Sequence, residues 1–365
     1  MDVSSSSNSG VEAGLGFSFQ KCSAMCLLLD NFPQIGNRKY FIAFEHHDDF
    51  LYVFLNDDDH IEEVLAYQAK KKALSSSWGT DDKLAEIICK LTVTGQNILL
   101  DNSVIRSASY KHSLNFVTNA AINLHNGKRG KKKQSIKIDS SQDRIKFSIL
   151  NDEIKNEIES KVISHKEQHE LTQIKNIEFS YINLLNKHSE NKNLLIGKMT
   201  TIFGASIVDY KAAVETLMTI FNDSELVYNL GGLPKLNDTA KWVAKSQIEN
   251  TLDILTKEKK AYEFWRSHAA DLCKQLKIPL KHKRNFKEHL NNCFDCFKSL
   301  ENTEFKKILY FVRDNQHIDE DCYTEVSGIK ALLDEINRSI TIKLESYIIP
   351  FAVIAAYVET RNIDV

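Results

Sequence analysis

Residues 40–70 read YFIAFEHHDDFLYVFLNDDDHIEEVLAYQAK, and this stretch determines the fold expected for the first half of the chain. Residues 40–44, 50–55 and 63–69 are rich in aromatic and branched side chains, which favours three strands. The polar residues 46–48 form the turn between the first two strands. The sequence therefore predicts β-sheet structure here, with short polar connections.

Three polar side chains at the ends of these strands are expected to lie near one another. Asp49 opens the second strand, and Gln68 and Lys70 lie two residues apart at the end of the third. Side chains at positions i and i+2 project from the same face of a strand. If the two strands pair as a hairpin, all three side chains converge on one point. Glu45 is close enough to join them through the turn, although the sequence does not fix its strand face.

This set of side chains is suited to hydrolysis of a phosphodiester bond. The reaction needs a hard cation that polarises the phosphoryl oxygen and holds a water in line. Mg²⁺, with Mn²⁺ as the alternative, is held by one or two carboxylates, and phosphate and water complete its shell. We expect Asp49 to be the principal ligand, Gln68 a weaker second ligand and Glu45 an additional one. Lys70 would orient or deprotonate the water and stabilise charge on the phosphate.

An Asp followed later by a Gln-x-Lys triplet also arises by chance, because all three residue types are common on protein surfaces. His46 and His47 next to Asp48 suggest a transition-metal site instead. Adjacent residues on an extended chain point in opposite directions, so at most one of these histidines can join the site. A solvated turn is the simpler interpretation of both histidines.

The length of 365 residues suggests two domains, since a single core rarely grows beyond about 250–300 residues. A formal charge of −2 excludes a strongly basic chain, so any DNA-binding surface must be local. Seven scattered cysteines do not fit a disulfide-stapled secreted domain, and no secretory signal is visible at the N-terminus. The longest apolar run, 347–357, contains Pro350 and is too short to span a bilayer. We therefore expect a cytoplasmic protein with no membrane segment.

The chain divides into a disordered tail at 1–10, an α/β domain at 11–230 and a helical domain at 231–365. The boundary signal is the segment 229–234, Asn-Leu-Gly-Gly-Leu-Pro, beyond which the sequence has helical periodicity and no convincing strand. Within the α/β domain we predict helices or helical stretches at 17–29, ending before Pro33, at 80–91, capped by Thr80, and at 143–171, 193–203 and 207–221. Further strands are predicted at 97–100, 114–118 and 177–184, and a loop at 75–78.

Basic residues gather in three places that suit sequence-independent contacts with phosphates. The first contains Lys71 and Lys72 beside Lys70. The second is a glycine-broken loop with Lys128, Arg129, Lys131, Lys132 and Lys133, for which an ordinary solvated hairpin explains the charge equally well. The third is the stretch 274–287 in the helical domain, which suits DNA or an acidic partner.

His289, Cys293 and Cys296, with His282 and Cys273 nearby, superficially resemble a zinc site. The segment is predicted to be one continuous helix, and apolar residues flank its cysteines. Free cysteines in a helical core are the commoner explanation of such a pattern.

Several motifs together resemble one nuclease family. They are Gly16–Gln20 opening a helix, Phe44-Glu45 before Asp48-Asp49, Gln68-Ala69-Lys70, the Trp78 loop and the strand 114–119. Over about residues 11–220 the chain resembles the PD-(D/E)xK double-stranded DNA endonucleases that serve as effectors of bacterial CBASS and Lamassu anti-phage systems. The resemblance implies a restriction-endonuclease-like fold in which Asp49, Gln68 and Lys70 are catalytic and Gln20 and Glu45 support them. Many enzymes of this class have Glu where this chain has Gln68, and a neutral amide binds metal more weakly.

The compact helical tail is most similar in architecture to the Lamassu nuclease subunit. That similarity implies an SMC-like ATPase partner, a small third subunit and activation by homo-oligomerisation. The expected function is a magnesium-dependent nuclease that cuts double-stranded DNA and is held inactive until a phage or plasmid signal arrives. Two alternatives stay open at this point: a catalytically inactive subunit of a defence complex that binds DNA or partners, and an RNase.

Overall fold

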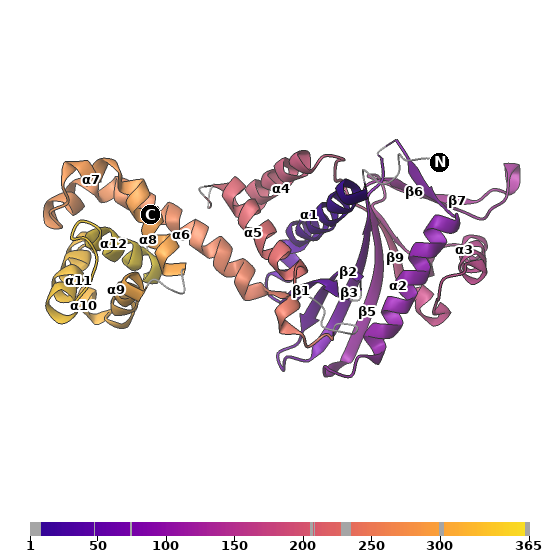
Figure 1. Cartoon of the computed structure of the whole chain (residues 1–365), viewed down its shortest axis with the longest axis horizontal. Coiled ribbons are helices and arrows are strands. Elements are labelled where there is room, and N and C mark those ends of the chain that lie inside the picture. Colours follow the sequence, from indigo (N-terminus) through magenta and orange to yellow (C-terminus); the bar gives the residue numbers. More distant parts are fainter. Residues whose placement is uncertain are drawn as a thin grey trace. The chain divides into compact units, whose positions relative to one another are not determined.

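The computed structural model describes residues 9–46, 48–73, 75–204, 207, 209–227, 235–298 and 303–361 (Figure 1). These residues form two compact units. The first contains the described residues up to Ile202 together with Tyr210–Glu249, and the second contains the segment 203–209 and the residues from Asn250 onward. A mixed α/β sheet unit is thus followed by helices, as the sequence predicts.

The first unit is built on a seven-stranded mixed sheet with the order β10-β1-β2-β3-β5-β9-β8. Its first four strands in this order pair antiparallel, β3, β5 and β9 run parallel, and β8 pairs antiparallel at the far edge. The strands are β1 Lys39–His46, β2 Asp48–Leu55, β3 Ile61–Lys70, β5 Arg106–Thr118, β8 Arg144–Lys146, β9 Ile177–Tyr181 and β10 Trp242–Ala244.

The register between β2 and β3 sets which side chains share a face. Leu51 lies opposite Ala66 and Phe50 lies opposite Tyr67. Because directly paired residues project to the same side of a sheet, Leu51 and Ala66 face one layer, and Phe50 and Tyr67 face the other. The predicted strands at 40–44, 50–55 and 63–69 are confirmed. Successive side chains along each strand point alternately to the two layers.

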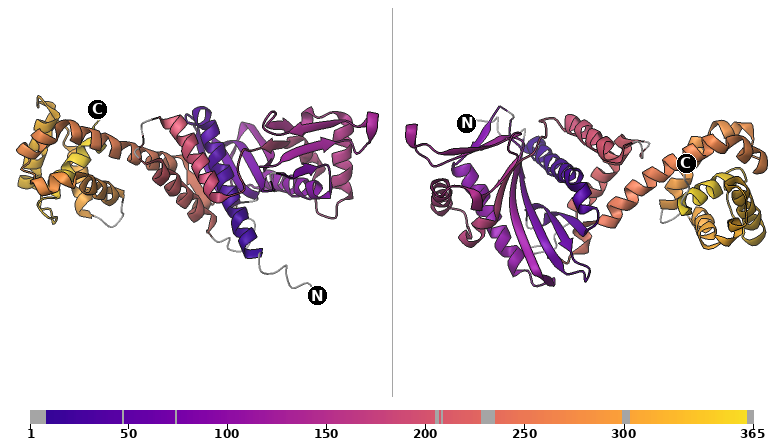
Figure 2. Two further views of the ribbon diagram at one scale, coloured as in Figure 1. Left: turned by 90° about the horizontal axis from the view of Figure 1, so that it is seen from above. Right: turned by 180° about the vertical axis from the view of Figure 1, so that it is seen from behind.

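Helices cover both faces of this sheet (Figures 1 and 2). Helices α1 (Ser9–Ile35) and α5 (Tyr210–Glu225) pack on one face, with α4 (His188–Phe203) beside them. Helices α2 (Asp82–Leu100) and α3 (Asp152–Ser164) lie on the other face. The Tyr52 hydroxyl donates a 2.6 Å hydrogen bond to the Ala24 carbonyl and so fixes α1 against β2.

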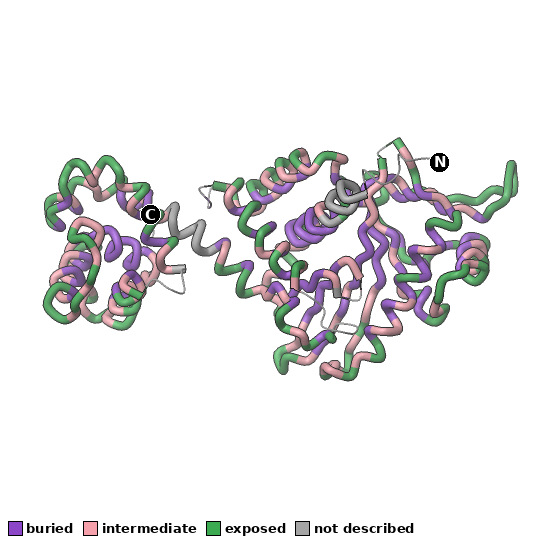
Figure 3. The backbone as a smooth tube through the Cα atoms, in the orientation of Figure 1, coloured by how far each residue is buried: buried purple, intermediate pink, exposed green. Residues whose placement is uncertain are grey.

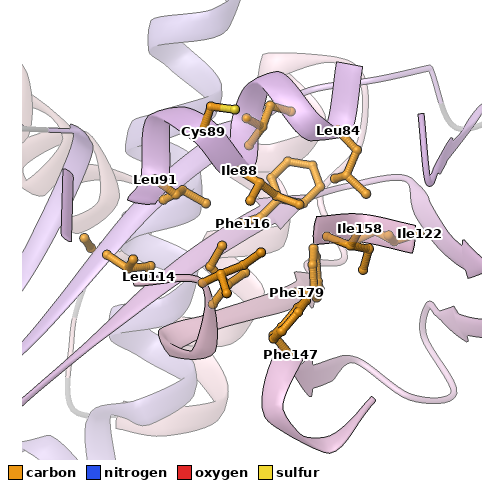
Figure 4. Close-up of a cluster of buried hydrophobic side chains, with 14 of the residues drawn as sticks. Leu84, Ile88, Cys89, Leu91, Leu114, Phe116, Ile122, Phe147, Ile158 and Phe179 are labelled. Atoms are coloured by element: carbon orange, nitrogen blue, oxygen red, sulfur yellow. The ribbon is translucent and has the colours of Figure 1, made fainter. Parts of the chain in front are cut away.

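The core on the α2 side is assembled mainly from large aliphatic and aromatic side chains, some of which are drawn in Figure 4. Phe116 of β5 and Phe179 of β9 are fully buried there, and α2 contributes Leu84, Ile88 and Leu91. Burying each such side chain stabilises the fold by roughly 1.5–3 kcal/mol. Figure 3 shows the same pattern along the backbone, with buried residues concentrated on the strands and on the inner sides of the helices.

A second sheet has the order β4-β6-β7, with β4 Ser77–Gly79, β6 Ala121–His125 and β7 Ser135–Ile138. The hairpin of β6 and β7 extends away from the main sheet (Figure 1), and its tip is the basic loop. The Trp78 indole N–H donates to the Thr118 hydroxyl at 3.0 Å, which links the two sheets. The predicted loop at 75–78 is therefore partly wrong, because Ser77 and Trp78 pair with β6.

Helix boundaries differ from the predictions in both long helices. Helix α1 continues through Pro33 to Ile35. Pro33 lies in its last turn, so the helix hydrogen bond that its missing N–H removes is close to the end of the helix. Helix α2 is capped by Asp81, whose carboxylate accepts the Leu84 N–H at 3.0 Å, while the Thr80 hydroxyl accepts the His125 N–H.

Two further predictions in this unit are wrong. Residues 97–100 continue α2 and do not form a strand, because Ile98 lies on the buried face of the helix. The stretch 143–171 is not one helix: it contains strand β8, a short 3-10 helix and α3. Strand β8 is half of an edge pair with β9, a long-range contact that helical periodicity cannot reveal.

The segment beyond residue 234 returns to the first unit. The predicted boundary signal, 229–234, lies outside the described residues. Strand β10 pairs with β1, and the Trp242 ring stacks on Phe41 with a centroid distance of 3.8 Å. The expectation of no strand beyond residue 231 is therefore wrong, and the first compact unit extends to Glu249.

The described part of the second unit consists of helices. They are the greater part of α6 (Lys245–Gln275), α7 Leu280–Arg284, α8 Phe286–Lys298, α9 Thr303–Asp314, α10 His317–Glu320, α11 Glu325–Ser339 and α12 Ile349–Thr360. Helix α12 is buried along most of its length and packs against α8, α9 and α11. Cys293 is fully buried beside Leu290 and Phe294 in the same core. Within the described residues, no helix is both long enough and apolar enough to cross a membrane.

Candidate active site

The structure brings Asp49, Gln68 and Lys70 together at one end of the main sheet. The backbone N–H of Ala69 donates a 2.7 Å hydrogen bond to Asp49 Oδ2, and Lys70 Nζ lies 3.7 Å from the same oxygen. Continuing the register of β2 and β3 places Asp49 opposite Gln68. The Asp49 side chain is 12% exposed and that of Lys70 38%, so the lysine is the more accessible group.

Gln20 and Glu45 also reach this site. Gln20 comes from α1 and is buried, and its side chain is close enough to hydrogen-bond Asp49 and Glu45. This hydrogen bonding only partly opposes the effect of burial, which raises the pKa of both carboxyl groups. Glu45 has a φ of 47°, in the left-handed region that costs a non-glycine residue about 1 kcal/mol or more. Such backbone conformations persist only where the surroundings hold them. The site therefore uses groups from α1, β1, β2 and β3.

Three neighbouring carboxyl groups in this site have raised pKa values. Burial raises the pKa of Asp48, and the charge of Asp49 raises it further. Burial also raises the pKa of Asp49, against the opposing effects of Lys70 and of hydrogen bonds from Ala69 and Gln68. The pKa of Glu45 is raised first by burial and then by Asp49. The site thus concentrates negative charge where solvation is poor.

Two oxygen atoms of the cluster lack a hydrogen-bond partner among the described residues. They are Asp48 Oδ2 and Gln20 Oε1, and both are buried. A buried oxygen without a hydrogen-bond donor costs about 1–3 kcal/mol. A bound cation or an ordered water would satisfy these two oxygens and remove that cost.

Sequence reasoning missed a buried lysine beside the cluster. Lys241 is 1% exposed, and its Nζ lies 3.5 Å from the carbonyl oxygen of Glu45. Its backbone carbonyl accepts a 2.6 Å hydrogen bond from Ser224. Burial lowers the pKa of Lys241, while the nearby Glu45 acts to raise it. The one local signal was the apolar triplet 242–244 that follows it, and that triplet lies beyond the domain boundary predicted from the sequence.

A second missed pair lies on the helices next to the site. Lys21 of α1 forms a buried ion pair with Glu225 of α5 and also donates to Asn222 at 3.3 Å. The charge of Glu225 contributes to the raised pKa of Glu45. Lys21 is thus neutralised by its own partner, whereas Lys241 adds positive charge beside Glu45. Neither lysine belongs to the predicted motif.

The predicted DNA-binding residues have different surroundings. Lys71 is half-buried, and Lys72 Nζ donates to the Ser77 carbonyl at 2.6 Å and lies 4.2 Å from the centre of the Trp78 ring. In the loop between β6 and β7, Lys128 pairs with Glu153 at 3.0 Å. The other cations of this loop are exposed and have no ion pair with the described residues: Arg129, Lys131, Lys132 and Lys133.

The oxygen donors of the site fit a hard divalent cation. Among the described residues, no three His, Cys, Asp or Glu side chains gather closely enough to hold a metal by themselves. Mg²⁺ does not require such a cage, because it binds through one or two carboxylates and keeps several waters. Asp49, the Gln68 amide oxygen and Glu45 would supply this kind of partial shell. His47 lies outside the described residues, as does the side chain of His46.

The hollow of about 350 Å³ on the α1 face of the sheet is separate from this site. Its lining includes Tyr52, Tyr67 and Arg144 and none of the predicted catalytic residues. Tyr52 and Tyr67 project to the side opposite Leu51 and Ala66, as the strand register requires. The candidate active site is instead an open position at the strand ends.

Comparison with known proteins gives one family. The family described as "Cap4, dsDNA endonuclease domain" matches residues 8–224, which is more than half of the chain. The matched segment contains Gln20, Glu45, Asp49, Gln68 and Lys70. No curated protein and no solved structure matches the chain.

The raised pKa of Asp48 predicts that Asp48→Asn stabilises the protein at neutral and alkaline pH. In the unfolded chain this carboxyl titrates near 3.8, and in the folded chain at higher pH. Between these values the folded state holds more protons, so its stability falls as pH rises. Asn removes the charge and keeps the Oδ1 atom that accepts the Asp49 N–H. We expect a higher Tm than wild type at about pH 8, with the difference shrinking as pH falls towards about 4.

The matched control is Asp58→Asn, in the exposed turn between β2 and β3, which should leave Tm nearly unchanged across the same range. Thermal unfolding followed by circular dichroism measures both variants. An Asp48→Asn protein that melts below wild type at alkaline pH would contradict the prediction.

Proposed function

Since the chain belongs to the family of Cap4 double-stranded DNA endonuclease domains, we propose that it is a metal-dependent nuclease that cleaves double-stranded DNA in defence against phages or plasmids. The observation that supports this most directly is the contact of Asp49 Oδ2 with the Ala69 N–H and with Lys70 Nζ, inside the matched segment. A carboxylate and a lysine on the paired ends of neighbouring strands are the groups that phosphodiester hydrolysis needs.

Each residue has a distinct role in the proposed reaction. Mg²⁺, or Mn²⁺ in its place, would be held by Asp49, Gln68 and Glu45, and when bound it supplies charge stabilisation to the phosphate. The Ala69 N–H fixes the orientation of the Asp49 carboxylate. Lys70, half exposed beside it, orients the attacking water, takes part in removing its proton and stabilises the charge that develops on the phosphate. Gln20 holds the Asp49 and Glu45 side chains in place.

Positive charge on the β6–β7 loop suits binding of the duplex. Arg129, Lys131, Lys132 and Lys133 have no competing carboxylate among the described residues, so phosphates are their natural partners. Lys128 would have to exchange Glu153 for a phosphate, and Lys72 is already engaged by the Ser77 carbonyl and the Trp78 ring. We assign Lys72 the smaller part in DNA binding for this reason, whereas Lys71 is half-buried and has no ion pair with the described residues.

We predict that the purified chain degrades plasmid DNA only with Mg²⁺ or Mn²⁺, and that Asp49→Ala and Lys70→Ala each remove at least about 100-fold of the rate. Asp58→Ala and Lys83→Ala are matched controls, since both side chains are exposed and lie outside the site. The assay compares loss of supercoiled plasmid with and without EDTA, and a parallel RNA substrate tests the RNase alternative. Intact DNA binding without cleavage under any condition would favour the inactive-subunit alternative instead.

We predict that Gln68→Glu lowers the metal concentration needed for half-maximal cleavage. A carboxylate binds Mg²⁺ more strongly than a neutral amide, and Gln68 lies next to Asp49. The measurement is cleavage rate against Mg²⁺ concentration, with Gln68→Ala as the control that loses the oxygen altogether. An unchanged midpoint in Gln68→Glu, together with full activity in Gln68→Ala, would remove Gln68 from the proposed metal shell.

We also propose that the helical unit assembles copies of the chain or binds an SMC-like ATPase and a small third subunit. The proposal rests on the Lamassu resemblance and on the need to restrain a DNA nuclease inside its own cell. Co-purification with the products of neighbouring genes, followed by mass measurement with and without phage DNA, tests it. A chain that stays monomeric, binds none of these products and is fully active alone would exclude this form of control.

A further inference from the structure

The helical unit contains a hollow whose rim is basic and whose floor is apolar. The hollow has a volume of about 510 Å³ and lies between α6, α7 and the start of α8. Its floor includes Trp265 and Phe286, whose rings stack with centroids 5.5 Å apart. Arg266, Lys283 and Arg284 also line it, and we call these three residues the basic rim.

The cations of the basic rim have no carboxylate partner among the described residues. Arg266 and Arg284 are exposed, and Lys283 is partly exposed. Residues 272–287 contain no Asp or Glu, and in the same stretch lie Lys274, Lys277, Lys281 and Lys287. No acidic side chain of this stretch therefore competes for Lys283 and Arg284 of the rim, and Asp271 and Glu288 flank it.

Cations elsewhere in the same unit are arranged differently. Many of them form an ion pair with a carboxylate: Lys307 with Glu304, Arg313 with Asp314, Lys330 with Asp334, Arg338 with Glu335 and Arg361 with Asp319. The contrast shows that lack of pairing is a property of this surface and not of the whole unit. Unpaired positive charge held together in this way is available to an anion from outside the chain.

We propose that the basic rim is a second DNA-binding surface, which holds the phosphate backbone of the duplex outside the catalytic site. The proposal rests on the function proposed above, because that function makes double-stranded DNA the anion this chain encounters. Arginine matches phosphate with two parallel N–H donors, and two of the three rim residues are arginines. The hollow is too small for a duplex, so contact would be made by the rim with adjacent phosphates and would carry no sequence preference.

A binding measurement separates this surface from catalysis. The parent protein is the full chain with Lys70→Ala, so that a fluorescent duplex is bound and not cut. The test variant adds Arg266→Gln, Lys283→Gln and Arg284→Gln. The control adds Lys307→Gln, Arg313→Gln and Arg338→Gln, which removes the same charge from the same unit at exposed, paired positions whose loss costs little stability. Circular dichroism and Tm establish that all three proteins are folded.

We expect the test variant to bind DNA at least about tenfold more weakly than the parent at ~0.1 M salt, with a salt dependence shallower by roughly one per lost phosphate contact. The control variant should stay close to the parent in DNA affinity and in salt dependence. Unchanged binding and slope in the test variant would overturn the proposal and point to an acidic protein partner, and an equal loss in the control would overturn it in favour of net charge. A parent that binds no DNA would overturn both this surface and the proposed function. A parent that binds while wild type never cuts would overturn only the proposed function.

Discussion

The pairing of β2 with β3 is the constraint on which the rest of the site depends. The register sets Leu51 against Ala66 in the core and, at the end of the same two strands, Asp49 against Gln68. A slip of one residue would turn every side chain of one strand to the opposite face, so the buried aliphatic residues protect the alignment of the polar ones. The hydrogen bond from Ala69 to Asp49 then fixes the carboxylate directly to the neighbouring strand. Core packing and chemistry are thus set by one interaction.

The cluster of Glu45, Asp48 and Asp49 lowers the stability of the folded chain, as buried carboxyl groups of a catalytic site commonly do. Burial raises the pKa of Glu45, Asp48 and Asp49, and the charge of Asp49 raises the pKa of the other two further. Burying charge is unfavourable unless a partner compensates for it. Lys70 compensates part of the charge of Asp49, and Lys241 part of that of Glu45. Carboxyl groups with shifted pKa values beside an accessible lysine, here Lys70, are typical of functional sites, and the family match covers these carboxyl groups and Lys70.

Local patterns in the sequence predicted the parts of the fold that local patterns govern. Alternating aromatic and branched residues gave β1 to β3, and the spacing of Asp49, Gln68 and Lys70 gave the face they share. Long-range pairing was not visible: β8 was taken for helix, and β10, with Lys241 just before it, was missed. A three-residue edge strand has too short a pattern to distinguish from a loop, and its identity comes from β1, about two hundred residues earlier. The predicted end of α2 was too early because the branched residues Ile98, Leu99 and Leu100 suit either a helix or a strand.

Because β10 pairs with β1, the sheet beside the candidate site is completed late in synthesis of the chain. A chain made from its N-terminus exposes strands β1 to β3 early, and domains of this kind begin to fold as they emerge. Lys241 follows only after almost all of the α/β unit has been made, and until then the carbonyl of Glu45 lacks its lysine and β1 has an unpaired edge. In the unfinished chain the proposed catalytic groups therefore lack Lys241 beside them. The candidate site is complete only once translation has passed beyond the matched segment 8–224.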